Sequence, residues 1–276
     1  HGRYIRQALD SVLAQQADFS WEICIGEDES SDGTREICRE YAARHPERIR
    51  LFLRKRADVI QIGGRPTGRF NLLETLKSCR GRYIALLDGD DYWLSPLKLR
   101  RQVEYLEAHP KIAVCGHRVR CIDAAGNPRP ELGLPPPGRS VSTTHDLLER
   151  NFIATCSVMY RAGLFGEFPP WFSRVHAGDW SMHLLNSLHG DIAYLDEELA
   201  AYRLHGGGVW LSANEAQRLR WAIDGLRIVS GALPHAYRRR IREVMHGRQA
   251  ALADISGRPR SAATHRRLAA DLAAGA

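Results

Sequence analysis

The chain has 276 residues, of which 44% are hydrophobic and 26% charged, and it carries a formal net charge of +7. This composition is typical of a globular protein and excludes a disordered chain, a collagen-like repeat and a small disulfide scaffold. No apolar run approaches the ~20 residues that a membrane-spanning helix needs. The length suits one large α/β domain, or a domain of about 200 residues with an appendage. The basic excess indicates either an anionic partner or a solvated basic surface.

Helix and strand patterns alternate along most of the chain. Apolar residues recur at helical spacing from Tyr4 to Leu13, so the sequence opens on an amphipathic helix with no strand before it. We then predict strands at Trp21–Gly26, Ile49–Leu53, Tyr83–Leu87, Ala113–Val119, Cys156–Tyr160, Ile192–Leu195 and Leu199–Arg203, and helices at Thr34–His45, Asn71–Ser78, Leu97–Ala108, Asp146–Arg150 and Asp179–His189. This alternation predicts a mostly parallel sheet flanked by helices. From Asn214 onward the sequence predicts helices, and Asp123–Ser140 is expected to be a surface loop.

The six cysteines form no CxxC pair and no zinc-ligand spacing. Most of them stand among apolar residues, as Cys24 does between Ile23 and Ile25. We therefore expect reduced thiols in the core of a cytoplasmic protein rather than disulfides.

The first acidic cluster is Glu27-Asp28-Glu29, directly after the predicted strand Trp21–Gly26. Ligands of α/β sheets bind at the carboxyl ends of the strands, which makes the loops that follow strands candidate sites. Capping of the next helix accounts for Asp32 and Thr34, but not for three crowded carboxylates. A carboxylate at this position can accept hydrogen bonds from a nucleobase or a ribose.

The second acidic cluster, Asp88-Gly89-Asp90-Asp91, follows the apolar strand Tyr83–Leu87. Carboxylates two residues apart, with Gly between them, can converge on one hard cation such as Mg²⁺ or Mn²⁺. An acidic turn is the simpler interpretation, because Asp-Gly is common in turns. Three acids between a buried strand and Tyr92 exceed what a turn requires, so the cluster favours a metal–diphosphate site.

The segments Ile23–Thr34 and Gly81–Trp93, with the first helix Tyr4–Gln15, resemble those of family 2 glycosyltransferases, which have the Rossmann-like GT-A fold. The likeness extends from His1 to about Trp210. It implies a GT-A domain over residues 1–210 and a helical C-terminal extension over residues 211–276. In the family a strand precedes the helix that opens this sequence, so that first strand is expected to be missing.

The resemblance implies roles for five residues in the first half of the chain. Asp28 matches the family aspartate that binds the nucleotide base, with Glu27 beside it in the nucleotide-sugar site. Asp88 and Asp90 match the DxD motif, with Asp90 as the metal ligand and Asp88 nearer the ribose. Arg65 resembles a nucleotide-contacting arginine of some members, and its simpler interpretation is a solvated loop residue.

Two later motifs complete the implied site. Asp179, in Gly178-Asp179-Trp180, matches the catalytic base, although the family's usual motif has an acid where this chain has Gly178. An N-cap is the alternative for Asp179. His205, before a run of three glycines, matches a further metal ligand, and Arg203 is expected to face the diphosphate. A structural histidine is the alternative for His205.

The function implied is that of a metal-dependent (Mn²⁺ or Mg²⁺) inverting glycosyltransferase. It would move a sugar from a nucleotide-diphosphate donor, with a UDP-sugar favoured, to a hydroxyl of a saccharide or lipid-linked acceptor in cell-surface polysaccharide or glycolipid synthesis. The alternative is a catalytically inactive, nucleotide-sugar-binding homologue. A haloacid-dehalogenase phosphatase also has Asp-x-Asp after an apolar strand, but its motif wants Thr or Val where this chain has Tyr92.

The basic residues are scattered and the strand ends are acidic, so we expect no nucleic-acid partner. The helix predicted around Arg238–Arg240 is amphipathic and basic. It is expected either to contact the inner face of a membrane peripherally or to pack on the domain with its arginines in water.

Overall fold

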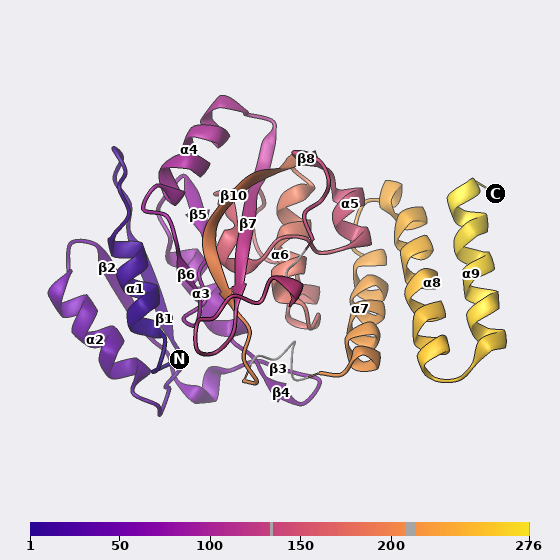
Figure 1. Cartoon of the computed structure of the whole chain (residues 1–276), viewed down its shortest axis with the longest axis horizontal. Coiled ribbons are helices and arrows are strands. Elements are labelled where there is room, and N and C mark those ends of the chain that lie inside the picture. Colours follow the sequence, from indigo (N-terminus) through magenta and orange to yellow (C-terminus); the bar gives the residue numbers. More distant parts are fainter. Residues whose placement is uncertain (133–134, 208–212, 276) are drawn as a thin grey trace.

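The computed structural model describes residues 1–132, 135–207 and 213–275 (Figure 1). Helices surround a central sheet, and three further helices follow the last strand of that sheet along the chain. The helices are α1 (Ile5–Leu13), α2 (Thr34–Arg44), α3 (Arg69–Ser78), α4 (Lys98–Ala108), α5 (Thr144–Glu149), α6 (Gly178–Ser187), α7 (Glu215–Ser230), α8 (Arg238–Ile255) and α9 (Pro259–Ala274). The strands are β1 (Ile23–Glu27), β2 (Ile49–Leu53), β3 (Gln61–Ile62), β4 (Arg65–Pro66), β5 (Tyr83–Ala85), β6 (Tyr92–Trp93), β7 (Ile112–Ile122), β8 (Val141–Ser142), β9 (Met159–Arg161) and β10 (Asp191–Arg203).

The central sheet has the strand order β5-β9-β7-β10-β6, with β8 also paired to β10. Its two long strands, β7 and β10, are parallel, whereas β5, β6, β8 and β9 pair antiparallel with their neighbours. β1 and β2 form a separate parallel pair. The predicted parallel character therefore holds for β1–β2 and β7–β10, and the central sheet as a whole is mixed.

The helices begin and end within a few residues of their predicted positions. Two predicted strands, Ile192–Leu195 and Leu199–Arg203, are one strand, β10, whose register against β7 shifts between Leu195 and Ala200. The polar residues at this irregularity made the strand look interrupted. The β3–β4 hairpin was not predicted, although its Gly63-Gly64 turn has the positive φ angles (59° and 75°) that a two-residue hairpin loop favours.

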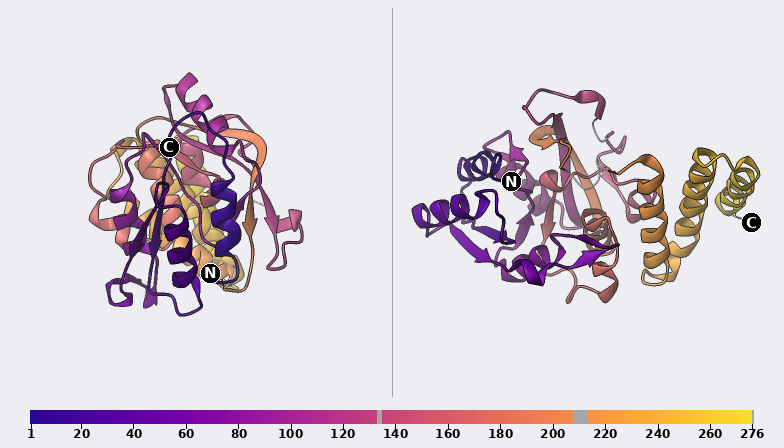
Figure 2. Two further views of the ribbon diagram at one scale, coloured as in Figure 1. Left: turned by 90° about the vertical axis from the view of Figure 1, so that its left-hand side faces the viewer. Right: turned by 90° about the horizontal axis from the view of Figure 1, so that it is seen from below.

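The main core lies between the sheet and the helices α5, α6 and α7. Leu147 of α5, Leu184 of α6 and Leu226 of α7 are all fully buried in one cluster. α7 therefore shares its core with the sheet, while α8 packs on α7 and α5 and α9 packs on α8. Figure 2 shows α7, α8 and α9 as successive layers, with α9 farthest from the sheet. The division at residues 210/211 stays a proposal.

Arginines of the basic helix α8 make hydrogen bonds to neighbouring helices. Arg239 donates hydrogen bonds to the carbonyls of Leu272 and Ala273 in α9, and Arg248 donates to the carbonyl of Glu149 at the end of α5. This arrangement agrees with a helix packed on the domain, although these arginines are bonded rather than only solvated. Among the helices in the described part of the chain, none is long and apolar enough to cross a membrane.

Lys98 is buried in the core, which was not predicted. Its ammonium lies 4.1 Å from the centre of the Trp93 ring, and within the described residues its Nζ has no hydrogen-bond partner. Burial lowers the pKa of Lys98 to about 7, whereas the unfolded chain keeps a value of about 10.4. The charged form is thus disfavoured by folding, and this penalty is full below pH 7 and fades as the pH rises toward 10.

We therefore expect Lys98→Met to raise the free energy of unfolding at pH 7, by about 1–4 kcal/mol, because an apolar chain of similar volume removes a buried unpaired charge. The gain should shrink between pH 7 and pH 10. Urea denaturation of both proteins across this pH range measures it, with the exposed Lys55→Met as the control. A variant less stable than the parent at pH 7 would show that the ammonium has a stabilising partner.

Candidate functional site

The acidic loop after β1 presents Asp28 and is held by Glu27. Glu27 is buried, pairs with Arg35, and accepts hydrogen bonds from the backbone N–H groups of Glu29 (3.1 Å) and Ser30 (2.7 Å). Asp28 Oδ1 is buried and has no hydrogen-bond partner within the described residues. Burial, followed by the negative charge of Glu27, raises the pKa of Asp28. Asp28 Oδ1 can therefore accept a hydrogen bond from a ligand. Glu27 instead stabilises the loop, because its carboxylate accepts hydrogen bonds from the loop backbone.

The DxD loop is tied to the end of β10. The Asp90 carboxylate lies 2.9 Å from Nε2 of His205, a contact across 115 positions of sequence. Asp91 turns inward and accepts a hydrogen bond from the backbone N–H of Arg203 at 2.7 Å. At Gly89 a Cβ would lie 3.0 Å from Ile5 of α1, so this turn packs closely on the first helix.

Asp88 lines the cavity and is reached by solvent there, but the surrounding protein partly desolvates its carboxylate. The resulting desolvation raises the pKa of Asp88, and the negative charges of Asp90 and Asp179 raise it further. The carboxylates of the DxD motif and of the predicted base therefore share one electrostatic environment. Asp179 stands in the first turn of α6, whose N-cap is Ala177, so the capping alternative for Asp179 does not hold.

The cavity has a volume of about 980 Å³. Its polar lining includes Asp88, Asn151 and Asp179, and Trp180 and Tyr202 contribute aromatic surface. Asn151 Nδ2 donates a hydrogen bond to Asp179 Oδ2 at 3.0 Å. The structure thus brings two predicted site residues, Asp88 and Asp179, to one cavity, together with Asn151 between α5 and α6, to which the sequence assigned no chemistry.

Six predicted residues lie outside the lining of this cavity: Glu27, Asp28, Arg65, Asp90, Arg203 and His205. Asp90 stands two residues after Asp88, which lines the cavity, and His205 contacts Asp90. Arg65 is exposed on the β3–β4 hairpin, with its guanidinium carbon 5.7 Å from the centre of the Trp221 ring of α7. The rest of the predicted glycine-rich segment, residues 208–210, lies outside the described residues.

Arg203 is nearly fully buried. Its guanidinium donates to the carbonyl of Asp90 at 2.8 Å and to Gln7 Oε1 at 2.8 Å, and it lies 4.4 Å from the centre of the Tyr4 ring. These contacts brace the DxD loop against α1. A direct role toward a diphosphate stays a prediction.

Gly178 stands where the family usually has an acid, and the buried Arg69 side chain lies close against it. A Cβ at this position would lie 2.5 Å from a guanidinium nitrogen of Arg69. Arg69 is buried at the start of α3 and donates to the carbonyls of Phe172 and Val175. Burial lowers the pKa of Arg69 to about 10, and Asp179 opposes this shift. The guanidinium therefore occupies the space beside the predicted base.

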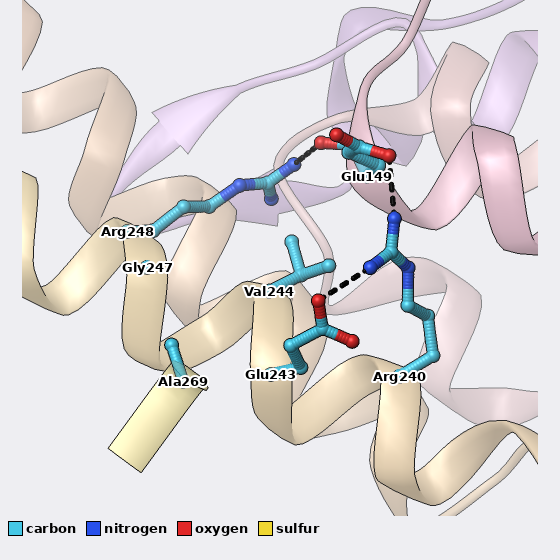
Figure 3. A pocket seen from close by; sticks show the side chains of 7 residues that line it. All are labelled: Glu149, Arg240, Glu243, Val244, Gly247, Arg248 and Ala269. Carbon is cyan, nitrogen blue, oxygen red and sulfur yellow. Dashed lines mark hydrogen bonds and ion pairs between the residues drawn. The ribbon is translucent and has the colours of Figure 1, made fainter. Parts of the chain in front are cut away.

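A second cavity, of about 290 Å³, adjoins the first and shares Glu149 and Arg248 with it (Figure 3). Arg240 of α8 pairs with Glu149 at 2.5 Å and with Glu243 at 2.6 Å. Arg248 points to the backbone carbonyl of Glu149 in the same view. These contacts tie α8 to the end of α5 and close this end of the larger cavity.

Asp90 and His205 form a donor set of one carboxylate and one imidazole. Within residues 1–132, 135–207 and 213–275, no three His, Cys, Asp or Glu side chains are grouped as a metal site. The two side chains are only about one-fifth exposed, and Asp88, two residues before Asp90, provides a further carboxyl group nearby. Oxygen and nitrogen ligands suit Mn²⁺ or Mg²⁺ that takes its remaining ligands from substrate oxygens and water. The residues present thus fit a cation shared with a phosphorylated substrate.

The model of glycosyl transferase family 2 matches residues 2–167. The chain therefore belongs to glycosyltransferase family 2. It is 41% identical over 223 residues to an uncharacterized protein of Mycobacterium tuberculosis, a match covering 80% of this chain and 61% of that protein. It is also 30% identical over 224 residues to a putative teichuronic acid biosynthesis glycosyltransferase of Bacillus subtilis, covering 80% and 81%. The chain thus spans about three-fifths of the first of these relatives.

Among solved structures, the fold resembles a mannosyltransferase from Pyrobaculum calidifontis in complex with GDP-Man and Mn²⁺. The TM-score is 0.60 at 18% identity, and the match covers 100% of this chain and 73% of the other. TarS of S. aureus, residues 1–349, matches with a TM-score of 0.55 at 14% identity, covering 96% and 87%. These likenesses confirm the α/β GT-A fold with its helical C-terminal region.

Proposed function

We propose that this chain is a metal-dependent inverting glycosyltransferase that moves a sugar from a nucleotide-diphosphate donor to an acceptor hydroxyl. One observation carries the proposal: Asp88, Asp90 and Asp179, from two distant segments, share one environment beside a cavity of about 980 Å³. Cavities of this size accommodate small-molecule substrates. Membership of family 2 and the GDP-Man–Mn²⁺ complex of the similar mannosyltransferase support the same substrate class.

Asp179 acts as the general base. Asn151 binds Oδ2 of its carboxylate, which leaves Oδ1 to take the proton of the acceptor hydroxyl as that oxygen attacks the anomeric carbon. Attack opposite the departing nucleoside diphosphate inverts the anomeric configuration. Most of the remaining rate enhancement comes from holding donor and acceptor in line within the cavity.

The donor's nucleotide is bound by the loops after β1 and β5. Asp28 accepts a hydrogen bond from the base, on a loop held by Glu27, and Asp88 lies toward the ribose. Arg65 contributes from the β3–β4 hairpin and Arg203 supports the diphosphate side through the DxD loop. Asp90 and His205 would hold Mn²⁺ or Mg²⁺, which when bound offsets negative charge on the departing diphosphate.

The acceptor is a saccharide or a lipid-linked saccharide of a cell-surface polysaccharide or glycolipid. The similarity to the Bacillus subtilis relative, a putative glycosyltransferase of teichuronic acid biosynthesis, supports an acceptor of this class. A UDP-sugar is our first choice of donor, and the GDP-Man complex of the similar fold makes GDP-sugars the first alternative.

A panel of UDP- and GDP-sugars, each with Mn²⁺ or Mg²⁺ and a set of saccharide acceptors, tests the proposal. We expect transfer with at least one donor and loss of transfer on addition of EDTA. Titration calorimetry with the same nucleotides accompanies the panel. Binding without transfer or donor hydrolysis supports an inactive homologue instead, and absence of nucleotide binding contradicts both.

His205→Ala should raise the Mn²⁺ concentration that gives half-maximal transfer by at least about 10-fold, the loss typical even for outer partners of metal ligands. The physical reason is that Asp90 would then be the sole protein ligand of this pair. A metal titration of the transfer rate measures the effect, with the exposed His189→Ala as the control. An unchanged metal requirement would assign His205 a structural role.

A further inference from the structure

The side-chain amide of Asn151 is fixed at both ends. Its Oδ1 accepts a hydrogen bond from the backbone N–H of Ile153 at 3.2 Å, and its Nδ2 donates to Asp179 Oδ2 at 3.0 Å. A flipped amide would place an NH₂ group against the N–H of Ile153 and an oxygen against a carboxylate, so both contacts select one orientation. The donor therefore always faces Asp179.

The supports of this contact are themselves rigid. Ile153 is fully buried. Asp179 lies in the first turn of α6, and the next residue, Trp180, donates a hydrogen bond from Nε1 to the carbonyl of Leu147 at 3.0 Å. The end of α5 and the beginning of α6 are thus joined by two side-chain hydrogen bonds. Groups held by buried neighbours in this way are preorganised, so little motion remains to be arrested when a substrate binds.

We propose that Asn151 is the positioning residue of Asp179. It holds one carboxylate oxygen of Asp179 by hydrogen bonding, so that the other faces the acceptor side of the cavity. This inference rests on the proposed glycosyl transfer and adds to it a residue outside the motifs that identified the site. Asn151 is a cavity residue, and its amide donates to an anion, a hydrogen bond stronger than one between neutral groups.

Two substitutions distinguish a role of Asn151 in positioning Asp179 from a role in supporting its own loop through the N–H of Ile153. Asn151→Asp keeps an oxygen acceptor for the N–H of Ile153 but replaces the donor to Asp179 with a carboxylate. Asn151→Ala removes both contacts. Asn127→Ala is the matched control, because Asn127 makes an equivalent bond, Nδ2 to Asp123 Oδ2 at 3.0 Å, in an exposed turn away from the cavity.

We expect kcat of Asn151→Asp and Asn151→Ala to fall about 10- to 100-fold, the loss expected for a hydrogen bond to a charged group. The KM for the donor and the melting temperature of Asn151→Asp should stay near those of the parent, and Asn127→Ala should match the parent throughout. The deficit of Asn151→Asp should shrink toward pH 5, because a protonated Asp side chain can again donate to Asp179.

The pH profile also reflects the other groups near Asp179. Those that interact with its charge are Arg69 of α3, Asp88 after β5, Tyr160 of β9, His183 of α6 and Tyr202 of β10. All of them are unchanged in the three variants. A pH-dependent difference between Asn151→Asp and the parent is therefore assigned to position 151.

Asparagine-selective ¹⁵N NMR tests the contact without any turnover. The side-chain NH₂ signals of Asn151 should move with pH in the parent as the Asp179 carboxylate titrates, and this movement should be absent in Asp179→Asn. Equal movement in both proteins would overturn the positioning role whether or not a donor has been found.

The kinetic outcomes also separate the two proposals. If the parent transfers sugar and Asp179→Asn does not, while Asn151→Asp equals the parent, positioning by Asn151 is wrong and the proposed function stands. If Asp179→Asn transfers as well as the parent, the proposed role of Asp179 as base fails, and the positioning inference fails with it.

Discussion

Asp179→Asn is expected to lower the rate of sugar transfer by about 10²- to 10⁴-fold, the contribution typical of a general base. The replacement amide is nearly isosteric, but it cannot accept the proton of the acceptor hydroxyl. Because Asp179 is assigned to the acceptor hydroxyl, and Asp28 lies outside the lining of the cavity that holds Asp179, binding of the nucleotide donor should be unchanged. Initial rates with the best donor, and calorimetric titration of that donor with Mn²⁺, give the two quantities.

Asp196→Asn is the matched control for this experiment, since Asp196 is an exposed residue of β10 that pairs with Arg118 at the surface. It should transfer sugar at the parental rate. Equal loss of donor binding and transfer in Asp179→Asn would indicate a structural role for the carboxylate. Unfolding measurements on the same samples then show whether the start of α6 has been lost.

The sequence predicted that Asp88 and Asp179 lie close together, and the structure places both of them at one cavity. Asp88 and Asp90 follow a strand and Asp179 begins a helix, and in an α/β fold such positions meet at one edge of the sheet. Their spacing within the motif and their order along the chain also matched a known family. The structure adds the pairing of Asp90 with His205, which closes a loop of 115 residues.

Contacts made by residues of ordinary appearance could not be predicted. Asn151 stands before an apolar segment and Arg69 stands two residues before the predicted helix Asn71–Ser78, so the sequence assigned no chemistry to either residue. Their functions depend on partners 28 and more than 100 positions away. The antiparallel pairings of β9 with β5 and β7 involve only two or three residues each, too few to leave a periodic pattern.

Gly178 and Arg69 should behave as one unit in a double-mutant cycle. In the parent, Gly178→Ala forces a methyl group against the Arg69 guanidinium, and overpacking of this kind costs about 1–3 kcal/mol of stability. Arg69→Ala alone should also destabilise, because it leaves the carbonyls of Phe172 and Val175 without their donor. Both effects are measured as free energies of unfolding in urea.

The sign of the Gly178→Ala effect should reverse once Arg69 is shortened. With the guanidinium absent, the methyl group has room, and Gly→Ala at a backbone position that alanine can adopt stabilises by about 0.4–1 kcal/mol because the unfolded chain loses entropy. Gly247→Ala in α8 is the control, since a Cβ there meets nothing within 4 Å and should stabilise the parent and the Arg69→Ala variant alike. Additive effects of Gly178→Ala and Arg69→Ala would mean that the arginine does not fill this space. In that case the glycine before Asp179 has another cause, such as close approach of the acceptor, and Gly178→Ala should reduce transfer without reducing stability.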